Sequence, residues 1–383
     1  MGKNKKADVY FIDFHAFQNK GILDKITILL EQLNLKSRLG KNSLVGIKTH
    51  FGEFGNTAYI RPVFFIPVIE HLKKLGAKPF LTDTNTLYVG MRSNSVDHLK
   101  DATLNGFTYS SLGVPVIIAD GLRSKNEHKL DVSLKHFKTV YLAEDILSAD
   151  YMIIISHFKG HELTGFGGAL KNVGMGCATR RGKLEMHSSI NPSVSKKNCI
   201  GCRRCVDWCP SSAIIIQDDK KAFIESVRCI GCGECIIVCP QKAIRINWNE
   251  TSPVFQEKMV EYVYGYHKEM KGKTVYINFV NEVSPGCDCF HINEPPVVQD
   301  IGVLASFDPV AIDKASLDLI NSVPGLKGSK CDGLPPASDK FKKITNDVDH
   351  NIQLNYASEL EIGNLNYNPV SYTHLTLPTK RIV

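Results

Sequence analysis

The chain has little that would mark a secreted, membrane or nucleic-acid-binding protein. The basic start "MGKNKK" is not followed by the apolar core of about 7–15 residues that a signal peptide carries. No apolar run approaches the length of about 18 residues that a membrane span needs. The net charge of +7 is small and mostly dispersed, which gives little support to nucleic-acid binding. We therefore expect a cytoplasmic protein with no membrane partner.

The composition is that of an ordinary globular protein, except for its cysteines. The chain has 383 residues, 43% hydrophobic and 22% charged, which is enough for two or three domains. Twelve cysteines in a chain without secretion signals argue for metal ligands rather than disulfides.

Eight of the cysteines form an internal repeat. "CIGCRRCVDWCPSSAI" begins at Cys199 and "CIGCGECIIVCPQKAI" begins at Cys229, and both follow the spacing C-x2-C-x2-C-x3-C-P. In this arrangement the fourth cysteine of each run binds the cluster of the other run. The first [4Fe-4S] cluster would use Cys199, Cys202, Cys205 and Cys239, and the second would use Cys229, Cys232, Cys235 and Cys209. Structural zinc is the alternative, although zinc gains nothing from a twin run of eight cysteines.

This repeat resembles the bacterial two-cluster ferredoxin over residues 191–247. The resemblance implies a small α+β domain with two [4Fe-4S] clusters that transfer one electron at a time. Since iron–sulfur clusters are damaged by oxygen when solvent reaches them, an anaerobic cytoplasm is the expected setting.

The rest of the chain predicts an α/β domain with a mainly parallel sheet. Continuous apolar strands, such as residues 43–51, 78–84, 138–143 ("KTVYLA") and 151–157, alternate with segments of helical periodicity, such as 22–33 and 63–76. The pattern resumes after the cysteines with a helix at 253–272 and a strand at 274–280. We predict an α/β domain in two parts, 7–190 and 249–366, with a ferredoxin domain at 191–248 inserted between them. Residues 371–383 are predicted to be a non-native tail.

Several of these strands end in ionisable residues. Ligands of open parallel sheets bind beyond the carboxyl ends of the strands, which makes these residues candidates for a site. Each one alone could equally cap a helix or start a turn. The candidate catalytic residues are His50, Asp83, His157, Lys159, His161 and Lys171.

Two further motifs lie near these candidates. "GFGG" at 165–168 is interpreted as a loop with exposed amides that leads into a helix and binds an anion, with Lys171 as a charge partner. Alternatively, its glycines allow close backbone packing against a cluster. Cys287 and Cys289 form "CDC", which could bind a soft metal, carry redox chemistry, or simply occupy a turn.

Nearly the whole chain, from residue 8 to about 366, resembles the domain-of-unknown-function 362 family in a form that carries a ferredoxin insertion. The stretches that carry the resemblance are "IKTHFGE", "LTDTNTLYVGMRSN", "HFKGHELTGFGGALKNVGMGC", the paired cysteine runs, "CDC" and "DIGVLASFDPVAIDKASLD". The family has no established reaction, so the resemblance implies a fold and two clusters rather than a substrate.

A more local stretch, "HELTGFGGALK", is similar to the histidine-to-lysine loop of nickel-pincer lactate racemases. His161 and Lys171 fit positions that serve the cofactor and the substrate carboxylate in that family. The cysteine runs depart from it.

Three functions remain open. The clusters could exchange electrons with a redox partner protein and a small-molecule substrate at an enzyme site. The chain could be a non-catalytic electron carrier. It could also be a racemase-like or maturation protein with structural or sensory clusters.

Overall fold

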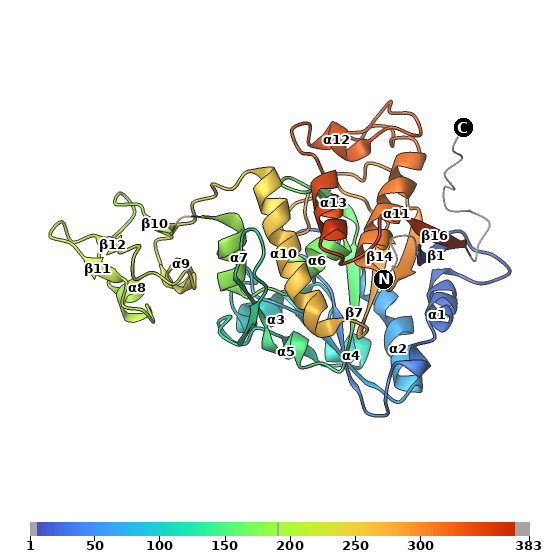
Figure 1. The fold of residues 1–383 in the computed structure, drawn as a ribbon, viewed down its shortest axis with the longest axis horizontal. Helices are drawn as coiled ribbons and strands as arrows, with labels where there is room; N and C mark the ends of the chain where they lie inside the picture. The colour runs from blue at the N-terminus through green and yellow to red at the C-terminus, as the bar shows by residue number, and fades with distance from the viewer. Residues whose placement is uncertain (1–5, 190, 372–383) are drawn as a thin grey trace.

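The computed structural model describes residues 6–189 and 191–371. Its main body is built around one eight-stranded sheet (Figure 1). In spatial order the strands are β16 (Tyr367–Ser371), β1 (Ala7–Asp13), β15 (Gly302–Ser306), β14 (Thr274–Val280), β7 (Tyr151–His157), β2 (Leu44–Lys48), β3 (Lys78–Asp83) and β4 (Val116–Ile118). All neighbours pair in parallel except β15, which is antiparallel to both β1 and β14. The predicted α/β class with a mainly parallel sheet is confirmed.

Helices cover both faces of the sheet because its central strands are apolar on both sides. Along β7, Tyr151, Ile153 and Ile155 pack into one core, whereas Met152 and Ile154 pack into the other. The first face carries α1 (Ile22–Gln32), α2 (Ile66–Lys74) and α3 (Ser95–Leu104), and the second carries α6 (Ala169–Gly174), α10 (Ser252–Met270), α11 (Pro309–Ser322) and α13 (Asn351–Glu359).

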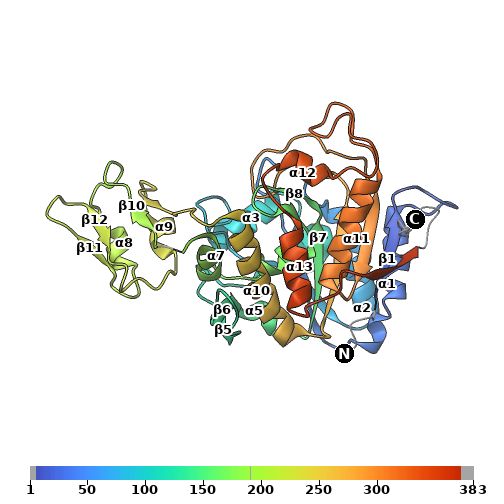
Figure 2. The same cartoon turned by 45° about the horizontal axis from the view of Figure 1, so that its top comes forward.

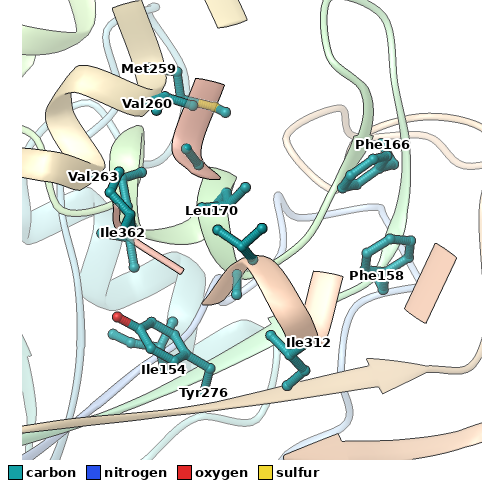
Figure 3. Packing of buried hydrophobic residues seen from close by; sticks show 14 of the residues in the cluster. Ile154, Phe158, Phe166, Leu170, Met259, Val260, Val263, Tyr276, Ile312 and Ile362 are labelled. Carbon is teal, nitrogen blue, oxygen red and sulfur yellow. The ribbon is translucent and has the colours of Figure 1, made fainter. Parts of the chain in front are cut away.

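The second face holds the larger core. Figure 3 shows Met259 and Val263 of α10 beside Leu170 of α6, with Ile154 and Tyr276 of the sheet beneath them. All five side chains are at most 2% exposed. This packing fixes α6 over the carboxyl end of β7, where the candidate site begins.

Shorter elements complete the body. They are η1 (Leu35–Ser37), η2 (Pro62–Phe65), α4 (Tyr109–Leu112), α5 (Glu144–Leu147), α7 (Arg180–His187) and α12 (Lys340–Ile344). The predicted strand "KTVYLA" forms as β6 (Thr139–Ala143), but it pairs with β5 (Glu127–Asp131) in a separate antiparallel hairpin and not in the main sheet.

The cysteine-rich segment leaves the body after α7 and returns at α10, and it stands apart from the sheet in both views (Figures 1 and 2). It contains β10 (Ser193–Val194), α8 (Arg204–Asp207), β11 (Ile214–Ile216), β12 (Ala222–Ile224), α9 (Glu234–Val238) and β13 (Ile244–Arg245). The sequence repeat is also a structural one, because α8 and α9 begin 30 residues apart (204 and 234), as do β11 and β13 (214 and 244). Strand β10 pairs with β13, and β11 pairs with β12.

Within the described ranges, no helix combines the length and apolar character needed to cross a membrane. The predicted non-native tail, residues 371–383, lies outside the described residues apart from Ser371, whose backbone pairs with Phe11 at the edge of the sheet.

Candidate functional site

The carboxyl ends of the adjacent strands β7, β2 and β3 open onto one cavity of about 1000 Å³, called the large cavity below. Because these strands are parallel, their last residues meet at the same edge of the sheet. The large cavity is lined by every candidate catalytic residue and by both cysteines of "CDC": His50, Asp83, His157, Lys159, His161, Lys171, Cys287 and Cys289. The sequence pattern thus identified residues that the fold brings together, and their roles remain predictions.

The glycine-rich stretch after β7 is not the loop that the sequence predicted. It forms a short antiparallel hairpin of β8 (Lys159–His161) and β9 (Gly165–Gly167). A Cβ on Gly160 would lie 2.2 Å from the carbonyl oxygen of Pro285, so only glycine allows the hairpin to approach the loop that carries Cys287. The absence of a side chain at Gly160 therefore allows close backbone packing beside the large cavity.

The predicted anion site on the amides before α6 is wrong. The amides of Ala169 and Leu170 donate to the Asp313 carboxylate at 2.7 and 2.9 Å, and the side-chain amide of Asn278 donates to it at 2.7 Å. Burial raises the pKa of Asp313 to about 6. A carboxylate from α11 therefore takes the place that the sequence assigned to a ligand.

One buried carboxylate, that of Asp288, holds two of the predicted catalytic side chains. His157 Nδ1 lies 2.9 Å from Asp288 Oδ2, and Lys159 Nζ lies 3.3 Å from the same oxygen. His157 Nε2 lies 2.9 Å from the carbonyl oxygen of Asn281, so each ring nitrogen is within hydrogen-bond distance of an oxygen atom. Burial works against ionisation of Asp288, but His157 and Lys159 hold its pKa well below its usual value.

His161 is arranged as a neutral imidazole. Its Nδ1 accepts from the amides of Leu163 and Thr164 at 3.2 and 3.3 Å, which leaves the proton on Nε2. Burial, followed by the charge of Lys171, lowers the pKa of His161 well below its usual value. His161 can therefore donate a hydrogen bond from Nε2, 3.6 Å from Glu162 Oε1.

His50 is held among donors. The amide of Gly52 donates to its Nδ1 at 2.9 Å, and Arg92 Nη1 lies 2.8 Å from its Nε2. Burial and then Arg92 lower the pKa of His50 well below its usual value, so the ring is neutral. Arg92 in turn forms an ion pair with Glu53 at 2.9 Å.

Lys48 and Asp83 form a buried ion pair at the ends of β2 and β3, with Lys48 Nζ 2.9 Å from Asp83 Oδ1. Burial alone would raise the pKa of Asp83, but the neighbouring charges, of which Lys48 is the largest, together lower it. Lys48 also donates to Asn172 Oδ1 at 2.6 Å. This pair ties the strand ends to α6.

Lys183 was not among the residues predicted from the sequence, because it lies on α7 and does not follow a strand. Its ammonium donates to Thr84 Oγ1 and to the carbonyl oxygen of Asn85. Burial lowers the pKa of Lys183 to about 8. A lysine with such a pKa changes protonation near neutral pH and is suited to acid–base chemistry.

Lys171 contacts the "CDC" motif, with its Nζ 3.6 Å from Cys287 Sγ. A hydrogen bond from the Cys289 thiol lowers the pKa of Cys287 well below its usual value despite burial, and Lys171 and Lys159 lower it further. The same hydrogen bond, followed by burial, raises the pKa of Cys289. The motif therefore presents one thiolate and one thiol.

The walls of the large cavity carry more positive than negative charge. Six cationic side chains line it, against the carboxylates of Glu53, Asp83 and Glu162. The cations are Lys48, Arg92, Lys159, Lys171, Lys183 and Lys242. Among the described residues, neither Lys171 nor Lys183 forms an ion pair with a carboxylate. This charge balance suits an anionic ligand.

The eight repeat cysteines gather around two small cavities of about 20 Å³ each. One cavity is lined by Cys199, Cys202, Cys205 and Cys239, and the other is lined by Cys209, Cys229, Cys232 and Cys235. Each cavity thus receives three cysteines from one run and the fourth from the other run. The donor sets are four thiols each, which fit a [4Fe-4S] cluster.

Backbone amides point at sulfur atoms in both repeats. The amide of Ala213 donates to Cys209 Sγ and that of Ala243 donates to Cys239 Sγ, both at 3.2 Å. Amide hydrogen bonds to cysteine sulfur are one of the factors that set the potential of an iron–sulfur cluster. In the described parts of the chain, no group of three or more His, Cys, Asp or Glu residues is arranged to hold a single metal ion. Cys287 and Cys289 therefore belong to no such group.

The cysteine-rich segment is docked on the body beside the large cavity. Glu234, 2% exposed, lies 3.5 Å from Arg180 and 3.2 Å from Arg123, both of the body. Lys242, whose amide donates to the carbonyl oxygen of Cys239 at 3.1 Å, lines the large cavity. Leu87, another lining residue, packs in the same apolar cluster as Cys199 and Cys205.

The solved structures that resemble this chain include two distant matches. A lactate racemase apoprotein from Thermoanaerobacterium thermosaccharolyticum is 13% identical with a TM-score of 0.37, over 72% of this chain and 51% of that one. A structural-genomics target protein from Thermotoga maritima is 12% identical with a TM-score of 0.38, over 75% of this chain and 57% of that one. At these values neither structure lends any property to this chain, which spans little more than half of their lengths.

No curated protein matches the chain. The model of the domain of unknown function DUF362 matches residues 45–318, which is well over half of the sequence. The protein described here therefore belongs to the DUF362 family.

Proposed function

We propose that the chain is an iron–sulfur redox enzyme in which residues 191–248 form an inserted two-cluster ferredoxin domain. The observation that carries the proposal is the exchange of the fourth cysteine between the two small cavities, with Cys239 joining the first run and Cys209 joining the second. A structural zinc site has no use for this exchange, whereas it is the ligation pattern of two-cluster ferredoxins.

When bound, two [4Fe-4S] clusters supply one-electron transfer. The chain's own contribution is to hold eight thiolates, to donate amides to Cys209 and Cys239, and to dock the segment on the body. Lys242, which follows Cys239 by three residues, lines the large cavity. This proximity favours electron exchange with a molecule bound in the large cavity, and a redox partner protein would meet the exposed side of the segment.

The substrate class is a small anion. Lys171 and Lys183 are cations without an ion-paired carboxylate among the described residues, and both face the large cavity. We assign acid–base roles to His161, which can donate from Nε2, and to Lys183, which exchanges a proton near pH 8. Asp83 positions Lys48, and Asp288 positions His157 and Lys159, around the same space.

The cluster part is tested by single cysteine substitutions in anaerobically prepared protein. Cys239→Ser should lower the iron content from about eight to about four atoms per chain by removing the cluster of the first run. Cys331→Ser, at a buried cysteine that lines neither small cavity, is the matched control and should leave the iron content unchanged. Equal iron in Cys239→Ser and the wild type would overturn the ligand assignment.

The cavity part is tested by calorimetric binding of succinate and inorganic phosphate. We expect binding of at least one probe that weakens by about tenfold in Lys171→Ala, because one charge–charge interaction of about 1.4 kcal/mol is lost. Iron content should stay the same in that variant. Equal affinity in the wild type and Lys171→Ala would contradict an anion site at Lys171.

A non-redox, racemase-like reaction is the second candidate. It is favoured by the presence of the neutral His161 and the cationic Lys171 in one cavity. The two functions differ in their dependence on electrons. A non-redox turnover would continue when cluster reduction is blocked, whereas the redox enzyme would stop.

A further inference from the structure

The "CDC" motif forms a tight turn at the wall of the large cavity. The amide of Phe290 donates to the carbonyl oxygen of Cys287 at 3.2 Å, and the amide of Cys289 donates to Cys287 Sγ at 3.4 Å. The two cysteine side chains are electrostatic neighbours, because each shifts the pKa of the other. Both residues line the large cavity, so a small molecule that enters it can reach them.

The two cysteines lie in different electrostatic surroundings. Lys171 Nζ is 3.6 Å from Cys287 Sγ, and this contact together with the hydrogen bond from the Cys289 amide stabilises a thiolate there. The neighbouring Cys287 side chain, followed by burial, raises the pKa of Cys289, which favours a thiol at that position. This asymmetry is the one expected of an attacking cysteine and a resolving cysteine.

We propose that Cys287 and Cys289 form a redox-active dithiol that reacts with an anionic low-molecular-weight disulfide in the large cavity. The Cys287 thiolate attacks one sulfur of the disulfide RS–SR, forms a Cys287–SR mixed disulfide and releases RS⁻. Cys289 then loses its proton and attacks the Cys287 sulfur, which forms the Cys287–Cys289 disulfide and releases a second RS⁻. The two electrons pass from the cysteine pair to the substrate disulfide, and one proton is released. This activity does not require the proposed iron–sulfur function.

The other cysteines lack this combination. Cys177 and Cys331 are fully buried and line none of the three cavities. Burial raises the pKa of Cys177 to about 12, which keeps it as an unreactive thiol. The remaining eight line the two small cavities.

The test compares two disulfides of similar size and opposite charge, 3,3′-dithiodipropionate (a dianion) and cystamine (a dication), with the full-length protein under anaerobic conditions. After an acid quench, peptide mapping by mass spectrometry follows each cysteine. We expect the Cys287–Cys289 disulfide to form about tenfold faster with the dianion, relative to the rates of both reagents with free cysteine, because the cavity is cationic. Equal or inverted rates would overturn the proposal.

Variants assign the two roles. Cys289→Ser should accumulate the mixed disulfide on Cys287, and Cys287→Ser should abolish the reaction while it retains the iron content of the wild type. Lys171→Ala should lose the preference for the dianion, whereas Lys100→Ala, at an exposed site on α3, should keep it. An adduct that forms first on Cys289, or on a cysteine outside the motif, would refute the assignment, and the wild-type rate ratio tests the proposal even if a variant does not fold.

Discussion

Replacing Asp288 by asparagine should remove the negative charge that holds His157 and Lys159 together. All three side chains are buried, with exposed fractions of 1%, 2% and 9% for Asp288, His157 and Lys159. Removing one partner of a buried ion pair costs about 3–5 kcal/mol, because the remaining charges are left in a medium that solvates them poorly. We therefore expect the free energy of unfolding at pH 7 to fall by about 3–5 kcal/mol in Asp288→Asn.

The destabilisation caused by Asp288→Asn should depend on pH. The pKa of Asp288 is depressed in the folded protein, so its stabilising contribution is complete above the unfolded value of about 3.9 and is lost as the pH falls through the folded value. The difference between the wild type and Asp288→Asn should be fully developed at about pH 5 and should shrink below about pH 4.

Urea unfolding followed by far-ultraviolet circular dichroism measures both effects. Glu70→Gln is the matched control, because the Glu70–Lys73 pair is 53% and 39% exposed and its loss should cost no more than about 0.5 kcal/mol. A cost below about 1 kcal/mol for Asp288→Asn at pH 7, or a difference that does not change between pH 7 and pH 3, would refute the reasoning.

Three further predictions follow from buried contacts. As the pH rises from about 8 to about 10.4, the free energy of unfolding of the wild type should increase by up to about 3 kcal/mol relative to that of Lys183→Met. The reason is that Lys183 keeps its proton in the unfolded chain over this range but has lost it in the folded protein. A difference in urea unfolding that does not change with pH would contradict the lowered pKa of Lys183. Gly160→Ala should destabilise by about 1–3 kcal/mol through its clash with Pro285, whereas Gly286→Ala, with open space around its Cβ, should be close to neutral in the same assay. Glu234→Gln should speed amide hydrogen exchange in residues 191–248 relative to the body, since two arginines lose their carboxylate, and unchanged exchange would argue against Glu234 as a docking residue.

The predicted residues that the fold brings together share one property. His50, Asp83 and His157 stand at the ends of apolar runs, and in a parallel sheet these ends must meet at one edge. Lys159 and His161 follow directly after β7. Such positions follow from local pattern and one topological rule, so no long-range contact had to be predicted.

The residues that the sequence missed are brought in by distant packing. Asp288 binds His157 across 131 residues of chain, and Asp313 binds Ala169 across 144. "GFGG" before a helix is compatible with either a bound anion or a carboxylate of the same protein, and only the position of α11 decides between them. The loop between β3 and α3 that carries Arg92 likewise shows no periodicity from which the position of Arg92 could be inferred.

The proposed ferredoxin domain rests on a pattern that is both local and repeated. Gly201 and Gly231 have φ of +67° and +70°, and Ser212 and Lys242 have φ of +50° and +47°, so the backbone repeats along with the cysteines. This agreement between spacing and backbone is independent of any cluster, and it arranges each set of four thiols around its own cavity.

The central claim is most directly tested by the metal content of protein that has been purified without oxygen. Iron, acid-labile sulfide, zinc and nickel should be quantified per chain, and electron paramagnetic resonance spectra should be recorded after reduction with dithionite. The account predicts about eight iron and eight sulfide, with the signal of two interacting reduced [4Fe-4S] clusters. Stoichiometric zinc without iron or sulfide, also after anaerobic reconstitution, would contradict it.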